Sequence, residues 1–206
     1  MISSYFFFRK NVINSIKDLN IKTNNLKVLD VGSSSISLLE RLGLPFKKLT
    51  LFDIKFIKLK KKKNINYIRG NLLNIEKYFR EASFDIVTAF DVIEHLKKKD
   101  AIHLVKKLKK ITSKILILYT PNGYLPQPPS KSNQFQEHLC GFSHRDLYNL
   151  GFVTKGCIGP KCLRGPYYKL KKPLMITYIL SLILSFFTKK IFKEYDASIF
   201  AVHYKK

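Results

Sequence analysis

Residues 26–36 read LKVLDVGSSSI, and this stretch decides the fold. An apolar run ends in Asp30, Gly32 follows two positions later, and three serines lead into a further apolar run. This order predicts a buried strand, a tight turn and the start of a helix. A glycine lets the backbone of such a turn approach a ligand, and the free N–H groups of the helix start face the same point. The turn therefore predicts a nucleotide-type site, although Ser34 and Ile36 stand where a G-x-G-x-G loop has glycines.

The length and charge of the chain limit the classes of protein that fit. At 206 residues the chain predicts a single domain with a substantial core. Lys and Arg number 38 against 14 Asp and Glu, a net charge of +24, which predicts attraction to nucleic acid, acidic lipid or an acidic substrate. The abundance of Lys, Asn, Ile, Phe and Tyr, with no Trp, equally fits a genome of low GC content. The basic run 58–63 is interpreted as a solvated helix end rather than as a phosphate-binding patch.

The three cysteines, Cys140, Cys157 and Cys162, indicate a reducing environment. Their number is odd and no secretory signal precedes them, so free thiols and a cytoplasmic location are expected. Together with His138 and His144 they match no familiar spacing of zinc ligands, and we predict no metal site.

Strand and helix patterns alternate through the first two thirds of the chain. An amphipathic helix is expected over residues 1–20 and a Lys-rich helix follows residue 96. Strands are predicted at 26–30, 49–54, 65–68, 84–90 and 115–119. This alternation is typical of a parallel sheet covered on both faces. Asp53 ends the second strand about twenty positions beyond the first turn, where nucleoside-binding folds place a carboxylate that accepts hydrogen bonds from ribose.

The last third begins with a polar loop and contains one strongly apolar segment. A helix is predicted from the N-cap Ser143 to Gly151, and strands are predicted at 152–157 and 198–204. The apolar segment 174–187 (LMITYILSLILSFF), with lysines on both sides, is shorter than a bilayer-spanning helix requires. We expect it to pack within the protein as a core or lid helix. The alternative is docking in a membrane interface, with its lysines against anionic headgroups.

Five segments together resemble a known family. VLDVGSSS, LFDI, IRGNLL, FDIVTAFDVIEHL and LILYTPNG, in this order and spacing, are similar to the Rossmann-like, class I S-adenosylmethionine-dependent methyltransferases of the branch with small-molecule, lipid or glycan acceptors. The resemblance is strong over 26–123, and HLCGFSHRDLYNLGF extends it towards the C-terminus. It implies a three-layer α/β sandwich with a mostly parallel, seven-stranded sheet, an apolar helix before the last strand, and that strand antiparallel beside the fifth. It also implies one domain, 1–206, in which 26–123 binds the cofactor and 124–206 forms the acceptor side.

The resemblance also implies roles for individual residues. Asp30 and Gly32 would lie against the methionine part of S-adenosylmethionine, Asp53 would hold the ribose, and Asn71 with the backbone of Leu72 would meet the adenine. Phe90 and Asp91 would line the pocket near the methionine end. The expected cofactor-binding set is Asp30, Gly32, Ser34, Asp53, Ile54, Asn71, Leu72, Phe90 and Asp91. Structural roles stay open: Asp30 could cap the following helix, Phe90 could be a core residue, and Glu94 and His95 could only begin the next helix.

Methyl transfer is an in-line displacement on a sulfonium, so positioning supplies much of the rate, and a hydroxyl or amine acceptor also needs a general base. His138 is the preferred candidate for this base, with His144 and His95 behind it. Two alternatives remain. An RNA methyltransferase is supported by the charge, although the chain has DVIE where nucleobase methyltransferases carry N-P-P-Y or D-P-P-Y. A degenerate, membrane-associated or partner-binding subunit is suggested by the serine-rich turn. A nicotinamide-dependent dehydrogenase fits the motif order less well.

Overall fold

The computed structural model describes residues 2–33, 37–56, 62–129, 134–164, 170–190 and 193–205, with side chains for all of these except 2–7, 182 and 185–190. Ser34 and most of the basic run 58–63 therefore lie outside the described residues. The helix expected at the first turn is the short α2 (Leu38–Arg41), with Ser37 as its N-cap.

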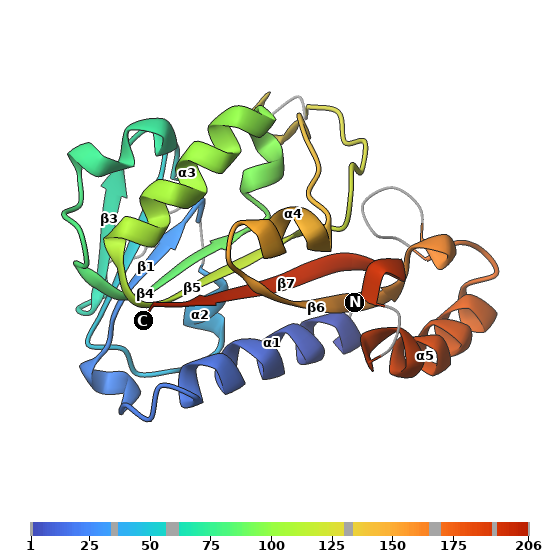
Figure 1. Ribbon diagram of the computed structural model, residues 1–206. Coiled ribbons are helices and arrows are strands. Elements are labelled where there is room, and N and C mark those ends of the chain that lie inside the picture. The colour runs from blue at the N-terminus through green and yellow to red at the C-terminus, as the bar shows by residue number, and fades with distance from the viewer. Residues whose placement is uncertain are drawn as a thin grey trace.

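A seven-stranded sheet in the order β3-β2-β1-β4-β5-β7-β6 forms the centre of the molecule (Figure 1). Its strands are β1 (Lys27–Val31), β2 (Lys48–Asp53), β3 (Ile65–Arg69), β4 (Phe84–Phe90), β5 (Thr112–Pro121), β6 (Val153–Pro160) and β7 (Asp196–Tyr204). The first five strands run parallel, while β7 is antiparallel to β5 and to β6. The predicted Rossmann-like, mostly parallel sheet with an antiparallel last strand beside the fifth is confirmed.

The central strands are apolar on both faces because each face is covered by helices. In β1, Val28 belongs to one buried cluster and its neighbour Leu29 to the other, as the alternation of side chains along a strand requires. Side chains of α1 (Ile2–Lys17) and α2 belong to the cluster that contains Val28. Side chains of α3 (Lys98–Ile111) and α4 (His144–Asn149) belong to the cluster that contains Leu29. Figure 1 shows α3 and α4 on one side of the sheet and α1 on the other.

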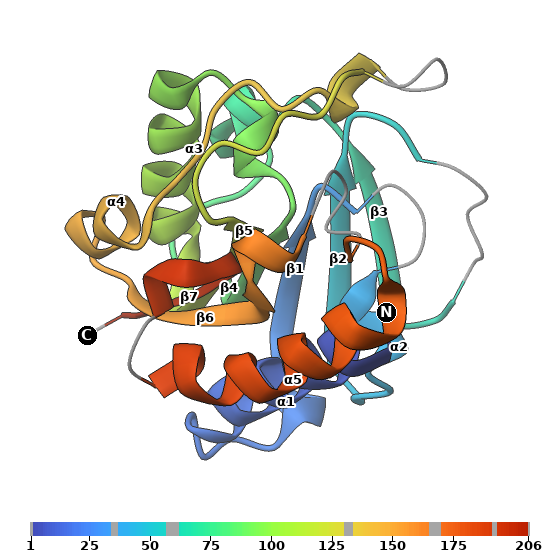
Figure 2. The same ribbon diagram turned by 90° about the vertical axis from the view of Figure 1, so that its right-hand side faces the viewer.

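The apolar helix α5 (Leu174–Lys190) lies on the same side of the sheet as α1 and packs against β6 (Figure 2). The side chains that it buries are polar: Thr177 and Ser181 occupy the face towards the protein. Eight large apolar or aromatic side chains of α5 are exposed: Leu174, Met175, Ile176, Tyr178, Ile179, Leu180, Ile183 and Leu184. The expectation of a core helix is therefore wrong for the side chains described, because its polar pair rather than its apolar residues face inwards. No helix in the described ranges is long and apolar enough to cross a membrane.

Candidate functional site

The strand order places a crevice at the carboxyl ends of β1 and β4. From this pair the chain proceeds outwards to β2 and β3 on one side and to β5 on the other. Ligands of open α/β sheets bind where the order reverses in this way. The register aligns the strand ends, since Val31 pairs with Phe52 and with Ala89, and Phe90 pairs with Tyr119. The residues that follow these strands therefore lie along one edge of the sheet.

Gly32 forms the turn after β1 and fixes it against the turn after β4. Its φ is +79°, a conformation that side-chain-bearing residues rarely adopt, and its N–H donates to the carbonyl of Phe52 at 2.8 Å. A Cβ at this position would lie 2.4 Å from Cγ2 of Val92. Glycine is thus required both by the backbone conformation and by the contact between the two turns.

Asp30 shapes the same turn from inside. Its side chain is only 2% exposed, and its carboxylate accepts hydrogen bonds from the hydroxyls of Ser33 (2.6 Å), Thr88 (2.6 Å) and Ser37. Burial raises the pKa of the carboxyl group, and the three hydroxyl donors oppose that shift. The N-cap of α2 is Ser37 and not Asp30, so Asp30 does not cap the helix itself; through the Ser37 and Thr88 hydroxyls it connects β1, β4 and the helix start.

The predicted ribose and adenine residues follow β2 and β3. Asp53 is half-buried at the end of β2, where burial raises the pKa of its carboxyl group, and its Oδ1 accepts from the Lys55 N–H at 2.9 Å. The carbonyl of Ile54 accepts from Nε of Arg69 at 2.8 Å. Asn71 caps the 3₁₀ helix η2 (Leu72–Lys77), its Oδ1 accepting from the Leu73 N–H at 2.9 Å. These side chains are therefore held at the same sheet edge as Gly32.

The turn after β4 is strained at Asp91. Its φ is +51°, in the left-handed region that non-glycine residues seldom occupy, and its N–H donates to the Tyr119 carbonyl at 2.8 Å. The side chain keeps contact with solvent, yet the surrounding protein removes enough hydration to raise the pKa of the carboxyl group to about 6. Phe90, just before it, packs edge-on against Phe8 of α1 with ring centroids 4.9 Å apart.

Two predicted residues, His95 and His138, meet Glu94 beyond β4 and β5. His95 and His138 have ring centroids 4.8 Å apart, although His95 belongs to the 3₁₀ helix η3 (Ile93–His95) and His138 to the loop before α4. Glu94 is 1% exposed, and its Oε2 accepts from the Thr120 hydroxyl at 3.0 Å. Burial and the adjacent charge of Asp91 raise the pKa of Glu94 well above its ordinary value. The Glu94 carbonyl accepts from the N–H groups of Leu139 (2.8 Å) and Cys140 (3.2 Å), which fastens the loop to this turn.

The remaining candidates lie elsewhere. His144 is buried, with Nδ1 2.9 Å from the Thr154 hydroxyl between α4 and β6, and the structure does not bring it to the other two histidines. Cys140 and Cys157 are buried, whereas Cys162 is exposed. The sequence weighed Glu94 only as the start of a helix. Its adjacency to His95 directly after a strand end was the available signal for a role in the site.

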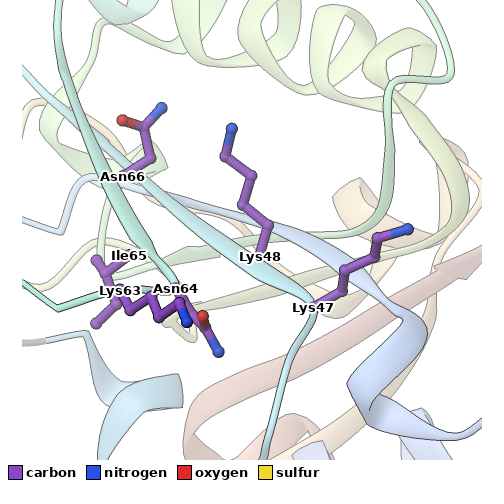
Figure 3. A pocket seen from close by; sticks show the side chains of 6 residues that line it. All are labelled: Lys47, Lys48, Lys63, Asn64, Ile65 and Asn66. Atoms are coloured by element: carbon purple, nitrogen blue, oxygen red, sulfur yellow. The ribbon is translucent and has the colours of Figure 1, made fainter.

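A basic pocket lies at the amino ends of β2 and β3, at the opposite end of these strands from the candidate site. It has a volume of about 400 Å³ and is lined by Lys47, Lys48, Lys63, Asn64, Ile65 and Asn66 (Figure 3). These residues begin β2 and β3, whereas the turns described above follow the carboxyl ends of the strands. The pocket is therefore separate from the candidate site.

Comparison with known proteins agrees with this geometry. Residues 29–124, just under half of the chain, match the family model of a methyltransferase domain. This segment is similar to a methyltransferase domain. It contains every described residue predicted to bind cofactor, and S-adenosylmethionine is the cofactor that the family implies. No curated protein sequence matches the chain significantly.

Solved structures share the fold of this chain at low sequence identity. An S-adenosylmethionine-dependent methyltransferase from Archaeoglobus fulgidus is 15% identical, with 98% of this chain and 99% of the other covered at a TM-score of 0.54. Phosphoethanolamine N-methyltransferase 2 from Haemonchus contortus is 13% identical, with 95% and 52% covered at a TM-score of 0.59. The [4+2]-cyclase SpnF is 9% identical, with 88% and 75% covered at a TM-score of 0.55. Since a cyclase shares the fold, the fold alone does not fix the reaction.

Proposed function

We propose that this protein transfers a methyl group from S-adenosylmethionine to a small-molecule, lipid or glycan acceptor. The observation that carries the proposal is the Gly32 turn, which contacts Val92 and lies level with Asp53 and Phe90 at the point where the strand order reverses. The whole chain, 1–206, acts as one domain, with 26–123 binding the cofactor and 124–206 forming the acceptor side. The odd number of cysteines suits a reducing, cytoplasmic location.

In this proposal the cofactor lies across the ends of β1, β2 and β4. The backbone at Gly32 faces the methionine part, Asp53 accepts from the ribose hydroxyls, and Asn71 with the backbone of Leu72 borders the adenine. Phe90 supplies apolar surface beside the sulfonium, and the Asp91 carboxylate faces its positive end. Ser34 and Ile54 complete the proposed set.

The acceptor side lies towards His95 and His138. During transfer an acceptor lone pair forms a bond to the methyl carbon, and the sulfur leaves with the electrons of the broken bond as a neutral thioether. The proton of a hydroxyl or amine acceptor passes to a base. Burial lowers the pKa of His95 and of His138, so both imidazoles are neutral at pH 7 and able to accept it.

Calorimetric titration of S-adenosylmethionine into wild type and Asp53→Ala tests the cofactor site. We expect micromolar binding that Asp53→Ala weakens at least about tenfold, because the ribose hydroxyls lose their acceptor. Asp100→Ala, on the first turn of α3, is the matched control and should bind as wild type does. Absence of binding by folded wild type would refute the proposal and favour the degenerate binding subunit.

The exposed face of α5 supports action at an anionic membrane surface. Met175 is 77% and Ile183 53% exposed, and the exposed Lys171 and Lys172 precede the helix. An apolar helix face beside lysines has the composition of an interfacial helix, and the net charge of +24 favours acidic lipid. A lipid acceptor would meet the enzyme at such a surface.

Sedimentation with lipid vesicles tests this surface. Wild type should bind vesicles containing phosphatidylglycerol more strongly than vesicles of phosphatidylcholine alone, and Met175→Glu with Ile179→Glu should reduce that binding at least about tenfold. Tyr148→Glu, which changes an exposed aromatic residue on α4, should leave it unchanged. Equal binding by the α5 variant and wild type would exclude the helix as the contact. Saturable, site-specific RNA binding would instead favour the RNA methyltransferase alternative.

A further inference from the structure

Glu94, His95 and His138 present ligand atoms to a common point. One ligand atom from each of these residues lies within 4.8 Å of those from the other two. Two of the residues belong to η3, directly after the turn that closes β4, and the third comes from the loop before α4. The cluster therefore joins separate parts of the chain rather than following from one local turn.

Both imidazoles are oriented by backbone carbonyls. Nδ1 of His138 lies 2.7 Å from the carbonyl of Leu125, and Nδ1 of His95 lies 2.9 Å from the carbonyl of Glu137. A neutral imidazole in this arrangement donates its Nδ1–H to the carbonyl and leaves the lone pair on Nε2. Metal-binding histidines are usually fixed by such a hydrogen bond through the other ring nitrogen. The backbone of Asp91 also forms a hydrogen bond with the His95 ring. A metal ion bound by His95 would replace that hydrogen bond.

Glu94 is the independent observation that points to a ligand. Its side chain is 1% exposed, and within the described part of the chain no N–H or hydroxyl group donates a hydrogen bond to its Oε1. The Asp91 carboxyl group acts on Glu94 through its like charge and through a side-chain hydrogen bond between the two carboxyl groups. Lys98, at the start of the following helix, donates instead to the Gly141 carbonyl and to Asp146. Two adjacent carboxyl groups need either a shared proton or a cation, and the two imidazoles beside them supply the further ligands that a metal ion needs.

We propose that Glu94, His95 and His138 bind one divalent transition-metal ion, with Asp91 beside it. Two imidazoles and a carboxylate suit Mn²⁺, Fe²⁺, Co²⁺ or Zn²⁺ better than Mg²⁺ or Ca²⁺, which prefer oxygen ligands. This site revises the expectation of no metal. The cysteines considered from the sequence take no part in it.

The position of the ion indicates the acceptor class, an inference that rests on the proposed methyl transfer. Three protein ligands leave coordination positions open, and the cluster adjoins Asp91 at the methionine end of the proposed cofactor site. An acceptor hydroxyl bound there would lose its proton more readily. With the ion bound, the Nε2 lone pairs of His95 and His138 are occupied, so the proton would leave through Asp91 or water and not to these histidines. The oxygen would then form the bond to the methyl carbon as the carbon–sulfur bond breaks. The acceptor is thus an oxygen nucleophile able to coordinate a metal.

Titration of metal-depleted protein with Mn²⁺ alone, followed by calorimetry, tests the site. Wild type should bind one equivalent, and Glu94→Gln, His95→Ala and His138→Ala should each weaken binding at least about tenfold. Glu94→Gln keeps an oxygen for the Thr120 hydroxyl and so preserves packing. His103→Ala, which removes an exposed histidine of α3 outside the cluster, should bind as wild type does. Circular dichroism verifies that each variant is folded.

Separate readouts distinguish this proposal from the proposed function. S-adenosylmethionine binding is measured in metal-free protein, where Asp53→Ala should weaken it and Glu94→Gln should not. Cofactor binding without Mn²⁺ binding, or Mn²⁺ binding unaffected by all three substitutions, would overturn the metal site alone. Mn²⁺ binding that depends on the cluster in a protein without cofactor affinity would support the metal site and refute the methyltransferase proposal.

Discussion

Glycine is required at position 32 by the positive φ and by the contact with Val92, and separate substitutions can distinguish these two requirements. Gly32→Ala should destabilise the fold by on the order of 3 kcal/mol, because the new Cβ meets Val92 in addition to the strain of a positive φ. Gly43→Ala is the matched control, since Gly43 has a φ of +68° with nothing within 4 Å of a Cβ, and it should cost about 1 kcal/mol. Urea unfolding measures both.

The contact with Val92 can be isolated by a double substitution. Val92→Ala should recover part of the stability that Gly32→Ala loses, because it removes the methyl groups that the new Cβ meets. Additive losses in the double variant would show that backbone conformation alone requires glycine at this turn.

Asp91 stores backbone strain at the proposed site, and Ala82 provides a remote comparison. Their φ values are +51° and +52°, so Asp91→Gly and Ala82→Gly should each stabilise the metal-free protein by roughly 0.5 kcal/mol. Only Asp91→Gly should lower the rate of methyl transfer. Loss of activity in both variants would mean that the substitutions act through general flexibility rather than through the carboxylate.

Among the helices, α1 contacts the candidate site through Phe8. Phe8 packs edge-on against Phe90, Tyr119 and Phe200, with centroids 4.9, 5.2 and 6.0 Å away. Phe8→Ala should therefore destabilise the protein by about 3 kcal/mol and weaken cofactor binding through the loosened Phe90 ring. Phe135→Ala, at a side chain that is 61% exposed, should change neither quantity. Thermal unfolding and cofactor titration provide the two readouts.

The elements that the sequence predicted well are those with local signals. The described cofactor residues lie at the carboxyl end of a strand or directly after it, and Ser143 forms the expected N-cap of α4 in a capping box with Asp146. The cluster of Glu94, His95 and His138 could not be predicted, because it depends on the loop that folds back onto the Glu94 carbonyl. The face of α5 was misjudged because apolar content indicates burial without revealing that Thr177 and Ser181 meet β6.

For the whole molecule, the net charge of +24 implies repulsion between many surface lysines. Raising the NaCl concentration from about 20 to about 300 mM shortens the screening distance and should raise the thermal unfolding midpoint by several degrees. An uncharged osmolyte at equal osmolality is the control. An unchanged or lower midpoint in salt would show that the repulsion is compensated within the fold.

The position of β7 has a consequence for biosynthesis. This strand follows β6 in the sequence, yet it lies between β5 and β6, so β6 joins the sheet through it. While residues 196–204 are still within the ribosome, β5 has an open edge and β6 has no partner in the sheet. The nascent chain therefore carries an incomplete sheet until β7 can pair with both strands.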